Sequence, residues 1–238
     1  MPRRLQGTRE EVRTLKKAAL AWSGGKDAAL AFEATDADDD VDLDVAALLT
    51  TFGENGRNNM HGVRRELIEA QASAIGAPLV AVELPEEPSN DEYERRMRDA
   101  LGGLADEDIE AVVFGDIFLE DVRTYRENTT PDRFETVFPL WGRDTDQLAR
   151  EAAERFDAGT VCVDGTSLGR EWTGETIGEG FLDRLPEYTD PCGENGEFHT
   201  FVADAPFFDS RVSYELGEVV ERELGGTTYF YQDLKVED

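Results

Sequence analysis

The stretch Trp22-Ser23-Gly24-Gly25-Lys26-Asp27-Ala28 constrains the fold of this chain more than any other part of its sequence. An apolar run over 18–22 leads into it and a helix-like run over 27–34 leaves it, which predicts a strand, a glycine-rich turn and a helix start. A helix N-terminus presents unpaired N–H groups and a partial positive charge. Adjacent glycines let the backbone approach a bulky anion closely. The stretch therefore predicts a phosphate-binding turn.

Two charged residues of this turn bear on its chemistry. Lys26 carries the only full positive charge of the turn, and Asp27 can either cap the helix or hold a divalent cation. The turn is not a Walker loop, because the spacer that precedes Gly-Lys in that motif is missing. The alternative is an ordinary strand-to-helix turn with a solvated lysine, since Gly-Gly turns are common.

Strand-like and helix-like segments alternate from this turn to about residue 164. Such alternation is typical of an α/β fold, a parallel sheet with helices on both faces. The expected strands are 18–22, 45–52, 78–84, 111–115, 136–140 and 160–163, and the expected helices are 27–34, 63–75, 91–104, 119–127 and 145–156.

The pattern changes after about residue 165, where glycines cluster. Three strand-like runs follow, 198–202, 211–220 and 227–236. We therefore expect an α/β domain over 14–164 and a smaller, β-rich α+β domain over 165–238.

Polar loops at the carboxyl ends of the expected strands are the candidate site, because ligands of parallel sheets bind there. Four loops qualify: 23–27, 53–61, 116 onward and 164–166. Asp116 directly follows a buried strand, and a structural cap is its alternative role. His61 lies in the second loop, where a surface polar group is the alternative.

The net charge of −29, from 53 acidic and 24 basic residues, is extreme. Such a surplus repels itself at low ionic strength and is screened at high salt. Because the acids are spread along the chain, we interpret it as halophilic adaptation to a salt-rich cytoplasm rather than as a surface for a basic partner. The basic segment 1–17 has no apolar region after it, and no apolar run reaches membrane-span length, so we expect a cytoplasmic protein without a membrane partner.

The cysteine and histidine content narrows the metal chemistry. Cys162 and Cys192 lack a Cys-x-x-Cys partner, and His61 and His199 are the only histidines. A cysteine zinc site, a disulfide framework and a histidine-rich metal centre are therefore not expected.

Three ordered motifs resemble one known family. The turn 23–27 resembles the Ser-Gly-Gly-x-Asp-Ser loop of the N-type ATP pyrophosphatases. Residues 139–144 and 192–200 resemble two further signatures of one branch of these enzymes, the diphthine–ammonia ligase family. The resemblance runs from about residue 18 to about 209. It implies a Rossmann-like, HUP-type ATP-binding domain with a PP-loop, completed by a C-terminal domain that closes the substrate cleft.

The family's chemistry follows from this resemblance. ATP is cleaved between its α and β phosphates in the presence of Mg²⁺, a substrate carboxylate becomes an acyl-adenylate, and ammonia converts the adenylate into an amide. The implied partners are ATP, ammonium and a carboxylate substrate, which for the family is diphthine on elongation factor 2. A homodimer is compatible with this assignment, and nucleic acid is not an expected partner.

The matched positions and the chemistry of their side chains give the expected site. Glu194 and Glu197 are expected to hold and deprotonate ammonium, although both could be mere turn acids. Asp27 is expected to hold Mg²⁺, and the adenine is expected near 50–53. The expected catalytic residues are Lys26, Asp116, Glu194 and Glu197. The expected nucleotide-binding residues are Ser23, Gly24, Gly25, Lys26, Asp27, Thr51 and His61.

Departures from the family pattern keep other functions open. Ala28 replaces the second serine of the loop, Asn195 replaces a glycine, and His199 stands where relatives carry glutamate. The segment 115–121 does not match the family's substrate-side segment. The resemblance therefore supports ATP binding more strongly than it supports diphthine as the substrate. The alternatives are amidation of a small-molecule acid such as a corrinoid carboxylate, an RNA-modifying ATP pyrophosphatase, and a non-catalytic nucleotide-binding sensor.

Overall fold

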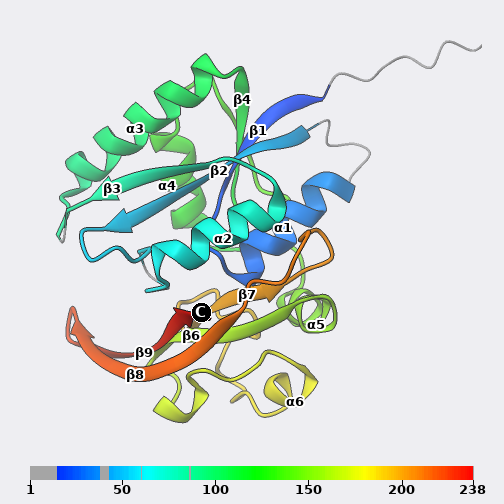
Figure 1. Ribbon diagram of the computed structural model, residues 1–238, viewed down its shortest axis with the longest axis vertical. Helices are drawn as coiled ribbons and strands as arrows, with labels where there is room; N and C mark the ends of the chain where they lie inside the picture. The colour runs from blue at the N-terminus through cyan, green and yellow to red at the C-terminus, as the bar shows by residue number, and fades with distance from the viewer. Residues whose placement is uncertain (1–14, 38–42, 60, 86, 238) are drawn as a thin grey trace, which may run out of the picture.

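The computed structural model describes residues 15–37, 43–59, 61–85 and 87–237, which form two sheets with their helices (Figure 1). The basic residues before position 15 and the acidic run 38–40 lie outside the described residues. A parallel five-stranded sheet occupies one half of the molecule, and an antiparallel four-stranded sheet occupies the other.

The first sheet has the strand order β3-β2-β1-β4-β5, with every pair parallel. Because β1 lies between β2 and β4, the strand order reverses at β1, and the glycine turn that follows β1 sits at this switch point. The strands are β1 (Lys16–Ala21), β2 (Leu43–Gly53), β3 (Leu79–Leu84), β4 (Ile109–Val113) and β5 (Glu135–Val137).

Helices cover both faces of this sheet, as the alternation predicts. Side chains of alternate strand residues enter two separate cores: Leu20 packs with α1 and α2, whereas Ala19 packs with α3. The helices are α1 (Lys26–Ala37), α2 (Arg65–Ile75), α3 (Asn90–Asp106), α4 (Glu120–Thr129) and α5 (Thr145–Arg155).

Side-chain caps mark the starts of α3 and α5. The Ser89 hydroxyl accepts the Glu92 amide (3.2 Å) at the start of α3, and the Asp144 carboxylate accepts the Gln147 amide (2.9 Å) at the start of α5. Each such cap contributes about 1 kcal/mol. The helices expected to start at 91 and 145 begin at Asn90 and Thr145, each directly after its capping residue.

The second sheet has the strand order β7-β6-β9-β8, with every pair antiparallel. Two short helices, η1 (Arg170–Trp172) and α6 (Glu179–Leu182), lie in the connection between β6 and β7. The strands are β6 (Asp157–Asp164), β7 (Phe198–Asp204), β8 (Tyr214–Leu224) and β9 (Thr227–Val236).

The placement of β6 corrects one prediction. The run 160–163 was expected as the sixth strand of the parallel sheet, but β6 pairs with β7 and β9 in the second sheet. A buried apolar run reads the same in either kind of sheet, because its pairing partners lie far along the chain. The second sheet thus begins at Asp157, ahead of the expected domain boundary at 164/165.

The loop 164–166 consequently does not lie at the carboxyl edge of the parallel sheet, and its predicted place in the site is wrong. The Asp164 carboxylate instead accepts the amide and the hydroxyl of Thr166, both at 2.7 Å. This is a local turn that begins after β6.

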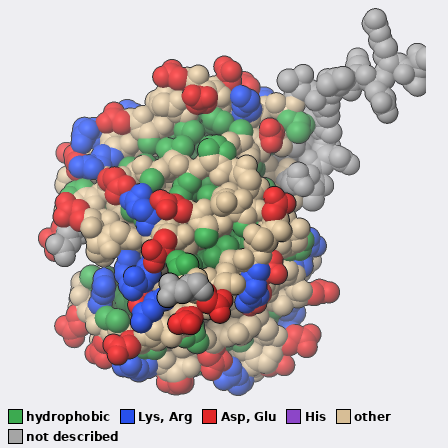
Figure 2. All heavy atoms as spheres, in the orientation of Figure 1, with side chains coloured by type: hydrophobic (Ala, Val, Ile, Leu, Met, Phe, Trp, Pro, Cys, Tyr) green, Lys and Arg blue, Asp and Glu red, His purple; other side chains and the backbone are tan. Residues whose placement is uncertain are grey.

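Two surface properties complete the description. Acidic side chains are spread over the face shown in Figure 2, with arginines and lysines among them, rather than gathered in one patch. Within the described residues, no helix is both long and apolar enough to cross a lipid bilayer.

Candidate active site

The glycine turn between β1 and α1 is pressed between α2 and β7. Gly24 has a φ of +83°, and a Cβ there would come within 2.6 Å of the Ile68 Cδ1 atom. At Gly25, a Cβ would lie 2.8 Å from His61 Cε1 and 3.0 Å from the Thr200 carbonyl oxygen. Both positions therefore require glycine, one for its backbone conformation and one for close approach.

Strand β7 of the second sheet forms one wall of the turn. The Val202 amide donates to the Gly24 carbonyl (2.9 Å), and the Lys26 amide donates to the Thr200 hydroxyl (3.0 Å). The Gln71 side-chain amide on α2 bridges the same wall, donating to the carbonyls of Gly24 (3.0 Å) and Val202 (2.6 Å). Thr200 and Gln71 had not been assigned a role from the sequence, because neither has a local signal that links it to the turn.

Lys26 is not the solvated lysine of the alternative interpretation, since it is 1% exposed. Its Nζ lies 2.9 Å from each carboxylate oxygen of Asp27 and also donates to the Cys192 carbonyl. Burial opposes the charge, but attraction chiefly by Asp27 outweighs it and raises the pKa of Lys26. The ammonium is thus held in place at the start of α1.

Ser23 lies in the glycine turn, and Thr51 lies in the neighbouring strand β2. The Ser23 hydroxyl accepts the Gly25 amide (3.3 Å), and its carbonyl accepts the Asn58 side chain (2.7 Å). Thr51 lies near the carboxyl end of β2, half-buried, and its carbonyl accepts the Asn59 amide (3.2 Å). The role of Thr51 toward adenine stays a prediction.

His61 lies against the turn rather than on a free surface. Its Nδ1 atom is 2.9 Å from the Thr200 carbonyl oxygen, and its ring contacts that of His199, with centroids 4.6 Å apart and the planes tilted by 30°. Burial lowers the pKa of His61 to about 4 and the pKa of His199 well below its usual value. Both rings are therefore neutral at neutral pH.

Glu194 contacts the loop that follows β4. Its Oε1 atom accepts the Ile117 amide (2.8 Å), so the turn 190–197 is tied to the loop that carries Asp116. Burial raises the pKa of Glu194 to about 7, and the charges of Asp27 and Asp116 add to the shift. Burial likewise raises the pKa of Asp116, against the attraction of Arg126. Asp27, Asp116 and Glu194 are called the carboxylate cluster below.

Glu197 has different surroundings from Glu194. It is buried, and its Oε1 atom accepts the Asp190 amide (2.9 Å) and the Asn195 side chain (3.1 Å). The Asp190 carboxylate in turn accepts the amides of Cys192 and Glu194, at 3.0 and 3.2 Å. Glu197 thus braces the turn that presents Glu194, and both hydrogen bonds of its side chain stay within that turn.

Arg126 on α4 stands beside the cluster and was missed from the sequence. Its Nε atom lies 3.6 Å from the Asp116 carboxylate, and its guanidinium lies 5.2 Å from the Phe114 ring centroid.

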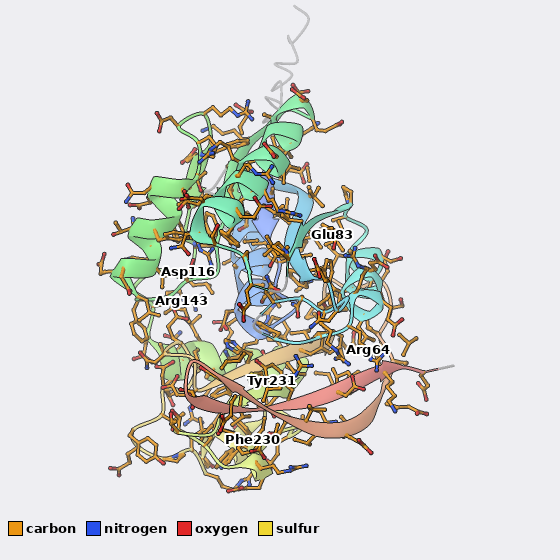
Figure 3. The ribbon with its side chains drawn as sticks, turned by 90° about the vertical axis from the view of Figure 1, so that its left-hand side faces the viewer. Arg64, Glu83, Asp116, Arg143, Phe230 and Tyr231 are labelled. Atoms are coloured by element: carbon orange, nitrogen blue, oxygen red, sulfur yellow. The ribbon has the colours of Figure 1, made fainter. Side chains whose placement is uncertain are left out.

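The loop after β5 is joined to the loop after β4, because the Gly142 amide donates to the Ile117 carbonyl (2.8 Å). Figure 3 shows Asp116 and Arg143 together on this side, where the two sheets meet.

Comparison with known proteins identifies the family. The model of the diphthamide synthase N-terminal domain matches residues 16–130, and that of the C-terminal domain matches 144–233. A diphthine–ammonia ligase of Schizosaccharomyces pombe is 30% identical over 138 residues, which are 55% of this chain and 23% of that protein. The chain thus spans about a quarter of the length of that relative.

Among solved structures, a predicted subunit of a tRNA methyltransferase from Methanocaldococcus jannaschii is similar at a TM-score of 0.41 and 15% identity, over 80% of this chain and 98% of that one. The two domain models match successive parts of the chain in order, and together they include strands of both sheets. The chain therefore belongs to the diphthamide synthase family, the diphthine–ammonia ligases.

Proposed function

We propose that this protein is an ATP-dependent ligase that adenylates a substrate carboxylate and then amidates it with ammonia. The proposal rests on the proximity of two side chains. Lys26 of the glycine turn is held by Asp27, and Glu194 is half-buried and has a pKa of about 7. The first suits a phosphate, and the second suits a proton transfer at neutral pH. Membership in the family supports the same chemistry.

The glycine turn is the proposed site of the ATP phosphates. The amides of Gly24 and Gly25, the Ser23 hydroxyl and the Lys26 ammonium would stabilise the negative charge of the leaving pyrophosphate. In this first step the substrate carboxylate oxygen bonds to the α phosphorus, and the bond between that phosphorus and the bridging oxygen to the β phosphate breaks. The products are an acyl-adenylate and pyrophosphate.

The donor set fits a Mg²⁺ ion that arrives with ATP. The described residues contain no cluster of three or more His, Cys, Asp or Glu side chains suited to a metal. The Asp27 carboxylate is 30% exposed and offers hard oxygen ligands, and protein-bound Mg²⁺ commonly takes one or two carboxylates together with substrate phosphates. Asp27 would then be the protein ligand, and the ion would supply neutralising charge for the phosphates.

Glu194 is the proposed base of the amidation step. Ammonium loses one proton to the Glu194 carboxylate, and the resulting ammonia attacks the acyl carbonyl. The bond between the acyl carbon and the AMP oxygen then breaks, and the nitrogen gives its second proton to the departing AMP or to water, which leaves the amide. Asp116, the neighbour that disfavours the charged form of Glu194, helps to set its pKa near neutrality. Glu197 would contribute by fixing the turn rather than by transferring the proton.

The first acid to test is diphthine, which the name of the relative suggests and which the family resemblance places on elongation factor 2. Purified protein with ATP, Mg²⁺, ammonium and diphthine-bearing elongation factor 2 is expected to release AMP and pyrophosphate in equal amounts with the amide. Release of ADP would contradict adenylation, and AMP formation that depends on tRNA would indicate an RNA-modifying enzyme. Nucleotide binding without turnover of any acid would indicate a sensor.

A small-molecule acid is distinguished in the same assay. Addition of a corrinoid carboxylate in place of the elongation factor should give no amide if diphthine is the substrate. Lys26→Ala is the matched inactive control, because it removes the ammonium from the turn.

A further inference from the structure

Arg126 differs from the other arginines at the carboxyl ends of β4 and β5. Arg123 and Arg143 each have a carboxylate oxygen close by, at 2.9 and 2.7 Å. The Asp116 oxygen lies 3.6 Å from the Arg126 Nε atom, beyond hydrogen-bond distance. That Nε is buried and has no hydrogen-bond partner among the described residues. The long ion pair to Asp116 compensates the Arg126 charge only weakly, so the guanidinium keeps capacity to bind a second carboxylate through its other nitrogens.

The guanidinium is held ready at this place. Its Cζ atom lies over the Phe114 ring, 5.2 Å from the centroid, and cation–π attraction favours this geometry. The Arg126 side chain is 31% exposed, so its other nitrogens can reach a ligand. A guanidinium presents a planar pair of donors that matches a carboxylate.

The surrounding charge explains why an acid substrate needs such a group. The carboxylate cluster Asp27, Asp116 and Glu194 repels an incoming anion. Lys26 is 1% exposed and already bound to Asp27 and the Cys192 carbonyl, so it is not free to receive a second anion besides phosphate. Arg126 touches a different member of the cluster, Asp116.

We propose that Arg126 binds the carboxylate of the acid substrate and thereby selects an acid over a neutral analogue. This inference rests on the proposed ligase function. Arg126 receives the anion at the end of β4, where Glu194 is tied to the Ile117 amide. The carboxylate that is to be adenylated is thus placed beside the group that later accepts the proton of ammonium.

The test uses the full chain with ATP, Mg²⁺, ammonium and diphthine-bearing elongation factor 2 as the acid. Arg126→Gln is expected to raise the KM for this acid about tenfold or more, with kcat changed less than about threefold, because a charge-assisted pair to the substrate is lost. The Kd for ATP with Mg²⁺ should stay within about twofold of wild type. Arg126→Lys should recover part of the KM, since it keeps the charge but not the fork.

Arg123→Gln is the matched control. It lies one turn earlier on α4, pairs with Glu127 and packs over the Trp141 ring, so its KM should stay within about twofold of wild type.

The outcomes separate this inference from the function on which it rests. An active wild type whose Arg126→Gln variant keeps the wild-type KM overturns the role of Arg126 and leaves the ligase function intact. A wild type that binds ATP but amidates neither diphthine nor a corrinoid carboxylate overturns both. If Arg126→Gln does not fold, Arg126→Lys decides: a raised KM with preserved kcat supports the role, and a lowered kcat with an unchanged KM overturns it.

Discussion

The Lys26 ammonium lies 2.9 Å from both carboxylate oxygens of Asp27, the residue next to it in the chain. The two partners are unequally buried, with Lys26 1% exposed and Asp27 30% exposed. The buried Lys26 therefore depends on Asp27 for charge compensation, whereas the Asp27 carboxylate can turn to solvent. In the proposed reaction, Asp27 would leave the lysine for Mg²⁺ as the phosphates take its place.

This asymmetry predicts unequal effects of the two single substitutions on stability. Asp27→Asn leaves a buried ammonium without its counter-charge and should lower the free energy of unfolding by about 3 kcal/mol. Lys26→Met leaves a carboxylate that can reach water and should cost only about 1 kcal/mol. Both variants should lose pyrophosphate release by about a hundredfold or more. Urea denaturation at constant KCl measures the first effect, with Asp146→Asn, which breaks the exposed pair to Arg150, as the near-neutral control. Equal losses of stability would refute the asymmetry.

The pKa of Glu194 predicts the pH dependence of amidation. Because its pKa is raised to about 7, the carboxylate that accepts a proton from ammonium is present above pH 7 and disappears below it. The kcat for amide formation should therefore rise through a limb centred near pH 7. Glu194→Gln, which keeps an acceptor for the Ile117 amide, should lose this limb and most of the activity. A limb that persists in the variant would assign it to another group.

The raised pKa of Glu194 also predicts how stability depends on pH. The free energy of unfolding should change with pH in the direction opposite to that caused by a salt-bridged carboxylate. The folded pKa lies above the ordinary glutamate value of 4.5, so between pH 4.5 and about pH 7 the folded chain binds more protons at this site than the unfolded chain. The free energy of unfolding should fall as the pH rises through this window. Glu194→Gln should be more stable than wild type at pH 8 and no more stable at pH 4, as measured by urea denaturation. A variant that is less stable at pH 8 would show that the folded protein favours the charged form.

Local signals explain what could be predicted from the sequence. Ser89 and Asp144 mark helix starts because the caps act within three residues, and the glycine turn is visible because strand, turn and helix are contiguous. The assignment of β6 failed because its strand partners, β7 and β9, lie far downstream.

The site shows the same division. Asp116 and Glu194 were expected to share a site, and the structure brings their loops together through the Ile117 amide. Thr200 and Arg126 gain their surroundings from residues distant in the chain or on another element, so no local pattern marks them. Glu197 and Glu194 are the same residue type within one turn, and only the direction of the side chain separates the bracing Glu197 from the half-buried Glu194 that accepts the Ile117 amide.

The acidic surface predicts that salt stabilises the fold. A net charge of −29, with acidic residues spread along the chain and over the face shown in Figure 2, repels itself, and the screening length falls from about 10 Å at 0.1 M to about 3 Å at 1 M salt. The midpoint of thermal unfolding should rise between these KCl concentrations. Sucrose at equal osmolarity, which screens no charge, is the control and should give a smaller rise. A midpoint that is independent of KCl would refute a halophilic adaptation.

Thr200 and Thr189 form a matched pair for testing the wall of the phosphate turn. Both are buried, but the Thr200 hydroxyl accepts the Lys26 amide, whereas the Thr189 hydroxyl has no hydrogen-bond partner among the described residues. Thr200→Val leaves a buried amide unpaired, so the free energy of unfolding should fall by about 1–3 kcal/mol. The KM for ATP should rise with it, since that amide begins α1 at the proposed phosphate site.

Thr189→Val replaces an unpartnered hydroxyl by a methyl group of the same shape and should be neutral or slightly stabilising. Thr200→Ser keeps the acceptor and should restore most of both quantities. Urea denaturation and ATP titration of the three variants make the comparison, and a Thr200→Val variant as stable as Thr189→Val would show that β7 does not hold the turn through this hydroxyl. The two threonines differ chiefly in what their hydroxyls meet, so the difference between their variants measures the contribution of the second sheet to the phosphate site.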